Sequence, residues 1–230
     1  YSSSDPGFTA MSVDELLAPH ADLVARIKLC YGTDRDTFER DVLALIHRYA
    51  AFVHLLPATA DNYFSAPGGL LRLGLEAGFF SLQGTDAHIF SGRLTITARR
   101  QLEPRWRLGT FIAGLCCELH RALSHVMVTD VHGGEWPPCL MPLAAWLQQH
   151  HARRYFVRWR PQATETRALG LFALPHVVAP EVLQHLCQDN TIIVPHMMSS
   201  IGGLPVYRDS NVLDELVRRS LALVIDRNLL

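Results

Sequence analysis

Apolar positions recur at helical spacing along most of the chain, and capping or breaking residues mark where these stretches begin and end. Ser12 and Glu15 form a capping box, in which each side chain can satisfy a free backbone N–H group at a helix start. Gly32 is suited to end that helix after about Leu29, and Pro57 ends the next apolar stripe. The pattern predicts helices over about residues 12–29, 38–56, 70–83, 105–126 and 142–149, with three or four more between 166 and 230.

Strand signals are confined to two short segments in the second half of the chain. Residues 126–130 are followed by Gly133-Gly134 and Trp136, which is typical of a hairpin with a glycine turn. Alternating apolar residues then predict a half-buried strand over 154–159, whereas the polar, irregular residues 83–103 indicate a surface loop. The sequence therefore predicts a mainly α fold with a small β-hairpin or sheet.

Composition places the chain among globular proteins. Its 230 residues are 49% hydrophobic, enough for one well-buried core. We expect a single domain over residues 1–230, with a helical core at about 12–128 and 165–230 and a small β-containing insertion at about 126–160. No apolar stretch approaches the roughly 20 residues that span a bilayer, so we expect a soluble protein without membrane contact. Five cysteines without a Cys-x-x-Cys pair favour a reducing, cytoplasmic environment.

The formal net charge is -1, so any attraction for nucleic acid has to be local. Two stretches are rich in arginine, whose planar guanidinium suits phosphate oxygens. The second one also alternates like an ordinary half-buried strand, which is the simpler interpretation. The candidate nucleic-acid contacts are Arg99, Arg100, Arg105 and Arg107 in the first stretch and Arg154, Arg158 and Arg160 in the second.

Residue types that bind divalent metals gather toward the end of the predicted helix 105–126. Cys117, Glu118, His120 and His125 lie close together in sequence, and Asp209 is a further candidate from the late part of the chain. Glu118 and His120 are also the candidate catalytic residues. Such side chains on an apolar helix are more often packed or solvated than ligating, and that interpretation stays open.

Other signatures of chemistry are missing from the sequence. There is no G-x-x-x-x-G-K-[ST] phosphate loop and no G-x-S-x-G nucleophile elbow. His47 and His54 share a helix face seven residues apart, and we interpret them as packing or surface residues.

Two segments resemble a known family. They are YAAFVHLLPATADNYFSAPGGLLRLGLEAGFFSLQ, residues 49–83, and RWRLGTFIAGLCCELHRALSHV, residues 105–126. Together they resemble the N-terminal domain of TraI-like, MobH-type relaxases from integrating conjugative elements. The resemblance implies an HD-type helical fold and, in family members, one or two divalent ions that activate water on a phosphate ester.

The chain departs from that family at nearly every metal-binding position. Asn62, Tyr63 and Phe64 stand where the family has a run of histidines, and Leu73 stands at a following histidine. The Asp-x-Gly-Lys that overlaps the family's His-Asp pair is Glu118-Leu119-His120-Arg121 here. Further family histidines correspond to the segment PQATETRALG and to about Asp209, and an Ala-Asp pair corresponds to about Ser220-Leu221.

Two hypotheses follow. The first is a degenerate, non-catalytic HD-fold domain without cofactor, which acts by binding DNA, a conjugative-transfer protein or a second copy of itself. The alternative is a metal-dependent phosphodiesterase or nuclease with a rearranged site and a divalent ion. Because successive helical residues turn about 100°, residues 117, 118 and 120 cannot face one point from a regular helix. The alternative therefore requires a distorted helix at this place.

Overall fold

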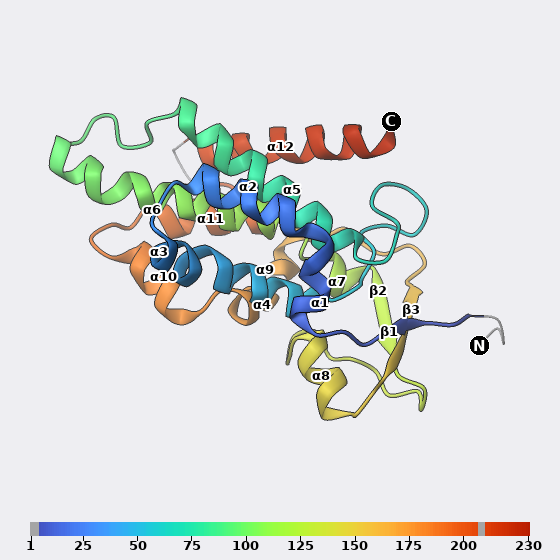
Figure 1. Ribbon diagram of the computed structural model, residues 1–230. Helices are drawn as coiled ribbons and strands as arrows, with labels where there is room; N and C mark the ends of the chain where they lie inside the picture. Colours follow the sequence, from blue (N-terminus) through green and yellow to red (C-terminus); the bar gives the residue numbers. More distant parts are fainter. Residues whose placement is uncertain (1–4, 207–209) are drawn as a thin grey trace.

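The computed structural model describes residues 5–206 and 210–230. Helices form most of it, and a small antiparallel sheet lies at one end (Figure 1). The predicted mainly α fold with a small sheet is therefore confirmed. The α-helices are α1 Val13–Leu17, α2 Ala21–Tyr31, α3 Arg35–Phe38, α4 Ala44–Val53, α5 Gly69–Gly84, α6 Ile96–Leu115, α7 Arg121–Ser124, α8 Leu143–Gln149, α9 Gly170–Val177, α10 Pro180–Cys187, α11 Ile193–Gly202 and α12 Val212–Leu229.

The sheet brings together strands that are far apart in the sequence. Its order is β1-β3-β2, formed by Phe8–Thr9, Arg154–Trp159 and Val126–Thr129, and both pairings are antiparallel. The predicted glycine turn follows β2, where Gly133 has a φ of 83° and Thr129 bridges Glu135. β2 pairs along its length with β3, whereas the predicted hairpin contributes only the single bridge between Thr129 and Glu135. β2 is therefore an edge strand of the sheet.

Local signals place the first helices correctly. The Ser12 hydroxyl accepts a hydrogen bond from the Glu15 backbone N–H and donates to the Glu15 carboxylate, both at 3.2 Å. Gly32 ends α2 in the left-handed conformation with a φ of 70°. Within this predicted helix, a 3₁₀ turn over Ala18–His20 separates α1 from α2.

The second predicted helix, over residues 38–56, is also interrupted. A π-helical segment, Glu39–Leu43, joins α3 to α4, and α4 ends at Val53. His54 follows with a φ of 48°, which turns the chain away from the helix axis before Pro57 is reached. The apolar stripe extended the prediction past the actual end of the helix.

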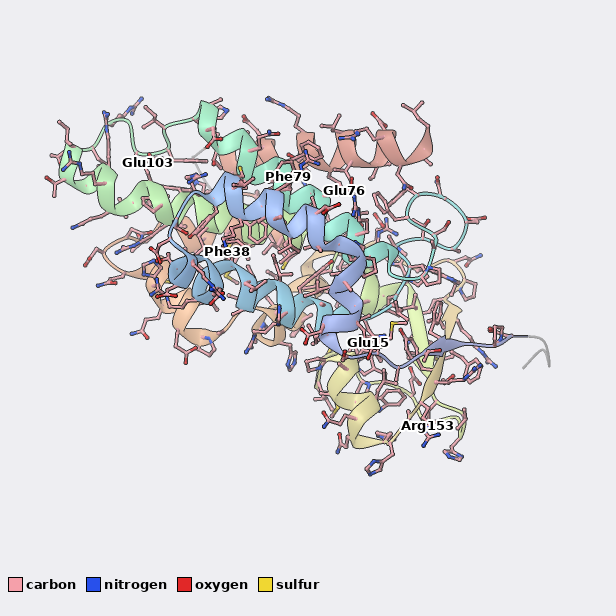
Figure 2. The ribbon with its side chains drawn as sticks, in the orientation of Figure 1. Glu15, Phe38, Glu76, Phe79, Glu103 and Arg153 are labelled. Atoms are coloured by element: carbon pink, nitrogen blue, oxygen red, sulfur yellow. The ribbon has the colours of Figure 1, made fainter. Side chains whose placement is uncertain are left out.

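Helix α6 differs most from the prediction. It begins at Ile96, inside the predicted loop 83–103, because the Thr95 hydroxyl caps it by accepting a hydrogen bond from the Ala98 N–H at 3.3 Å. Its first turns are polar because they face solvent, and Glu103 (Figure 2) ties them to the preceding loop by accepting hydrogen bonds from Ser91. The predicted regular helix through residue 126 is wrong, since α6 ends at Leu115.

Helices α5 and α6 pack closely against each other, and α12 lies along both (Figure 1). A Cβ atom at Gly74 would lie 2.6 Å from the Tyr49 hydroxyl and 2.8 Å from the Leu115 carbonyl, so only glycine fits there. Tyr49 in turn donates a hydrogen bond to the Leu70 carbonyl at 3.2 Å. This close approach brings the backbone of α5 next to Leu115, the last residue of α6.

The late helices begin near the predicted signals. Pro180 occupies the first turn of α10, and Pro142 directly precedes α8. Helix α12 starts after Asn211, whose side chain caps it, while Asp209 lies outside the described residues. Buried apolar side chains from the helices and the sheet form one continuous cluster. The division into a helical core and a β-containing insertion stays a prediction.

Candidate functional site

The segment after α6 leaves the helix before its polar residues are reached. Residues 116–120 form successive turns, with the Leu119 N–H donating to the Cys116 carbonyl at 3.1 Å and the Arg121 N–H donating to the Glu118 carbonyl at 3.1 Å. Cys117 and Leu119 are fully buried. The turns free the polar side chains of this segment from helical spacing, so Glu118 and His120 can face the same place.

Arg121 joins two carboxylates that come from different parts of the chain. Its Nε donates to Glu118, and its Nη2 donates to Glu165 at 2.8 Å and to the Tyr63 hydroxyl at 2.5 Å. The Glu118 side chain is 9% exposed and the Glu165 side chain 56% exposed. Burial raises the pKa of Glu118, and the charge of Arg121 opposes that shift. The guanidinium therefore compensates the charge of a buried carboxylate.

His120 lies between the same two carboxylates without a hydrogen bond to either. Its Nε2 is 3.9 Å from Glu118 Oε2 and 3.8 Å from Glu165 Oε1. The residue is only 2% exposed, and neither ring nitrogen has a hydrogen-bond partner among the described residues. Burial, followed by the charge of Arg121, lowers the pKa of His120 to about 4, so the ring is neutral near pH 7. A buried polar group without a partner is costly, and such a group calls for an explanation.

His125 approaches the cluster from the end of α7. The Ser124 hydroxyl donates to the His120 carbonyl at 3.0 Å and lies 2.8 Å from His125 Nδ1, so the hydroxyl oxygen can accept the Nδ1–H. His125 Nε2 lies 3.3 Å from Glu165 Oε1, within hydrogen-bond distance of that carboxylate. Burial lowers the pKa of His125, and the charge and hydrogen bond of Glu165 oppose that shift. Glu165 therefore contacts both Arg121 and His125.

The structure brings together only some of the residues that the sequence proposed as metal ligands. Glu118, His120 and Glu165 offer atoms within 4.8 Å of one another, a grouping that suits a metal ion, and His125 adjoins it. Burial raises the pKa of the Cys117 thiol to about 12, so it stays protonated and lies outside the group. Asp209 lies outside the described residues. Any catalytic or ligand role for these residues stays a prediction.

Sequence reasoning did not propose Glu165. It lies in PQATETRALG, the segment that corresponds to further histidines in the resemblance, and that correspondence was the available signal. The loop carrying Glu165 returns to the cluster from 44 residues away, next to Arg121. No local pattern announces such a long-range contact.

Comparison with known proteins gives a family. A profile described as "TraI_2: Putative helicase" matches residues 7–230, nearly the whole chain. The chain belongs to the TraI_2 family. No curated protein matches the sequence. The TraI-like part of the resemblance is thereby confirmed, while the HD-type fold and the MobH assignment stay predictions.

In this TraI_2 chain, two of the positions that carry metal ligands in the resemblance belong to the hydrophobic core, whereas Asn62 is exposed. Leu73 is fully buried and Phe64 is 7% exposed. The Gly68-Gly69 turn is retained, and a Cβ atom at Gly69 would lie 2.0 Å from the Phe64 carbonyl oxygen. Hydrocarbon side chains donate no lone pair, so these residues do not fit the one- or two-ion centre that the resemblance implies.

Glu76, which matches an acidic residue of the same motif, forms an ion pair with Arg72, with Arg72 Nε 3.0 Å from Glu76 Oε2. The i,i+4 spacing on α5 accounts for this pair. In this TraI_2 chain the acidic residue of the motif forms an ion pair within its own helix.

Most of the candidate DNA-binding arginines contact the protein's own backbone. Arg107 donates to the Cys30 and Tyr31 carbonyls at 2.8 and 3.1 Å and so caps the end of α2. Four other candidate arginines also donate hydrogen bonds to backbone carbonyls: Arg99 to Gly92, Arg105 to Gln188, Arg154 to Pro6 and Arg160 to Val126. Arg100 and Arg158 are exposed, and Arg158 also makes a contact within the protein. The first turns of α6 lie far from β3 in Figure 1, so the two stretches do not make one surface.

The described part of the TraI_2 chain holds no helix that is both long and apolar enough to cross a membrane.

Proposed function

We propose that this TraI-like protein is a non-catalytic domain of HD type, related to MobH relaxases, that acts by binding DNA or another protein of a conjugative-transfer apparatus. One observation carries the proposal: hydrocarbon side chains of the core stand at two positions where the resemblance has metal-binding histidines. Leu73 is fully buried, and Phe64 is nearly so. Side chains without a lone pair cannot hold a metal ion at these two positions.

A second candidate function is favoured by the backbone. The alternative of a metal-dependent phosphodiesterase required a distorted helix, and the chain does leave the helix at Cys116, which brings Glu118 and His120 together. Arg121 argues against this alternative, because its guanidinium donates hydrogen bonds to both Glu118 and Glu165. A carboxylate paired in this way is a poor general base, because its lone pairs and charge are engaged.

Hydrolysis assays separate the two functions. The purified protein would be incubated with Zn²⁺, Mn²⁺ or Mg²⁺ and with an aryl phosphodiester, single-stranded DNA and duplex DNA. We expect no turnover above that of Glu118→Ala, assayed in parallel as the matched background. A metal-dependent rate that Glu118→Ala removes would establish the phosphodiesterase and overturn the non-catalytic assignment.

Fluorescence anisotropy with labelled DNA tests the binding role. If DNA is the partner through the exposed arginines, the double variant Arg100→Ala/Arg158→Ala should bind more weakly, and the salt dependence of binding should become shallower. Arg219→Ala, an exposed arginine of α12 outside both stretches, is the matched control and should bind like the unmodified chain. Equal binding by all three proteins would assign the DNA contact elsewhere, and no binding by any would leave a protein partner.

A further inference from the structure

A cavity of about 700 Å³ opens between the loop of residues 88–94, the first half of α6 and the starts of α11 and α12. The loop lies at the end of the molecule away from the sheet (Figure 1). None of the described residues that line the cavity belongs to the cluster around Glu118. Its volume lies within the range of about 300–1,000 Å³ that binding pockets have, so the cavity is a candidate contact for a partner.

The inner wall of the cavity is built on aromatic rings that hold one another. The Phe90 ring stacks on Trp106, with ring centres 4.9 Å apart and planes 6° apart. His196 meets Trp106 edge-on at 5.5 Å, and its Nδ1–H donates to the Ile192 carbonyl at 2.7 Å. Apolar side chains complete the wall: Leu102, Ile193 and Leu213. A wall of fixed rings receives an inserted side chain at little conformational cost.

Aliphatic side chains surround the mouth of the cavity. Ile89 is 66% exposed, Leu94 45% and Ile192 50%. Single exposed apolar residues are common on protein surfaces, but three around one hollow with an apolar wall indicate a contact surface for another protein. Unpaired nucleic-acid bases bind by stacking on free aromatic faces, whereas the rings of Phe90 and Trp106 already stack on each other. The mouth therefore favours a protein segment over a nucleic acid.

The charges at the rim select the partner further. Arg93 lines the cavity and is exposed, and none of the described lining residues is acidic. Arg99 and Arg105 donate to the Gly92 and Gln188 carbonyls at the edges of the cavity, where they outnumber the exposed Asp189. The nearby carboxylate of Glu103 already accepts hydrogen bonds from Ser91. A positive rim of this kind complements an acidic partner.

We propose that the cavity binds a peptide segment of another protein, which inserts one large apolar side chain and carries Asp or Glu residues beside it. This proposal rests on the proposed function and specifies its protein partner. The inserted side chain covers the aliphatic mouth and contacts the aromatic wall, so it supplies most of the affinity. The flanking carboxylates face Arg93 in solvent, where they select the partner and speed its association.

A library of short random peptides displayed on phage provides the test. It would be selected on the immobilised full chain, and the enriched sequences would be synthesised with a fluorescent label for anisotropy. We expect these sequences to share one Trp, Phe or Leu with acidic neighbours. Replacing that apolar residue by Ser should weaken binding about 30-fold or more, as removal of an interface hot spot does.

Variants of the chain locate the contact. Ile89→Glu puts a negative charge at the apolar mouth and should weaken binding by about 30-fold, whereas Arg93→Glu reverses a rim charge and should weaken it by about 5-fold. Leu140→Glu, at a side chain 72% exposed outside the cavity, and Arg219→Glu are the matched controls and should bind like the unmodified chain. Ile89 and Arg93 are exposed, so both variants should fold, which circular dichroism checks.

The proposal is overturned if no peptide is enriched, if the enriched peptides lack acidic residues, or if Ile89→Glu binds them as tightly as the unmodified chain. A labelled single-stranded oligonucleotide whose binding Ile89→Glu abolishes would overturn it too, because the cavity would then serve a nucleic acid. Metal-dependent hydrolysis that Glu118→Ala removes would instead contradict the proposed function, and would leave the peptide contact standing.

Discussion

Two buried histidines, one after α4 and one after α6, have opposite surroundings. His54, at the end of α4, is fully buried, and His120, after α6, is 2% exposed. Burial lowers the pKa of each to about 4. By exposure and by pKa the two residues are indistinguishable.

Their partners separate them. His54 Nε2 accepts a hydrogen bond from the Met11 N–H at 3.0 Å, which leaves Nδ1–H to donate to the Tyr155 hydroxyl at 2.8 Å. His120 has no such partner in the described residues. Hydrogen bonds within the protein account for His54, whereas His120 lacks such bonds beside two carboxylates and is a candidate site residue. Burial alone does not make that distinction.

Removing Arg121 should produce the largest change in the His120 region. Arg121→Met leaves Glu118 buried without its cation, and breaking a buried pair in this way costs about 3–5 kcal/mol of the free energy of unfolding. Urea denaturation in the presence of chelator measures it. The double variant Glu118→Leu/Arg121→Met should recover most of the loss. A double variant as unstable as Arg121→Met would show that packing, rather than charge, holds this region together.

Removing the satisfied histidine comes next. His54→Leu leaves the Met11 N–H without its acceptor and removes the donor to the Tyr155 hydroxyl, which still accepts from the Leu55 N–H, so we expect a loss of about 1–3 kcal/mol. Urea denaturation measures this loss as well. His54→Gln, whose amide can replace part of the hydrogen bonding, should lose less. Equal losses for Leu and Gln would mean that the hydrogen bonds of His54 contribute little.

Acid should destabilise the protein through His54. Its pKa is about 4 in the folded chain and about 6.5 when unfolded, so between these values the unfolded state binds more protons. Stability from the neutral ring is present above pH 6.5 and falls as the pH drops toward 4, by roughly 2–3 kcal/mol. The free energy of unfolding against pH would be measured in a His120→Leu background, which removes the parallel titration of His120. Adding His54→Gln should flatten the curve, and an unchanged slope would contradict the assignment.

The smallest effect is expected at His120 itself. In the presence of chelator, His120→Leu removes two unpartnered nitrogens and keeps a side chain of similar size, so the free energy of unfolding should change by less than about 1 kcal/mol. Urea denaturation beside His54→Leu gives the direct comparison. A loss equal to that of His54→Leu would erase the difference between the two regions.

Local chemistry made much of this fold predictable. The capping box at Ser12, the left-handed Gly32 and Pro180 at a helix start act through neighbouring residues, so sequence reveals them. The start of α6 was missed because Thr95 caps a solvent-facing stretch that looks like a loop. Its end was missed because the apolar pattern continues through residues 116–120, which form turns instead.

The candidate site was half visible in the sequence. Glu118, His120 and His125 share one short segment, and their residue types alone marked them as candidates. Glu165 and the role of Arg121 depend on a loop that folds back from a distant part of the chain. Neither hydrophobic periodicity nor residue spacing encodes such a contact, so only the structure reveals it.

The order of the strands has a consequence for how the protein is made. The central strand, β3, comes last in the chain, and both of its neighbours are synthesised before it. β1 pairs with β3 through Phe8 and Tyr155, and His54 also contacts the Tyr155 hydroxyl. Neither contact can form until Tyr155 has left the ribosome. Pairing segments so distant in sequence is slow, because a long loop has to close first. The helices around α2 and α5 can therefore assemble during translation, while the sheet closes late and leaves an unpaired edge open to misassembly until then.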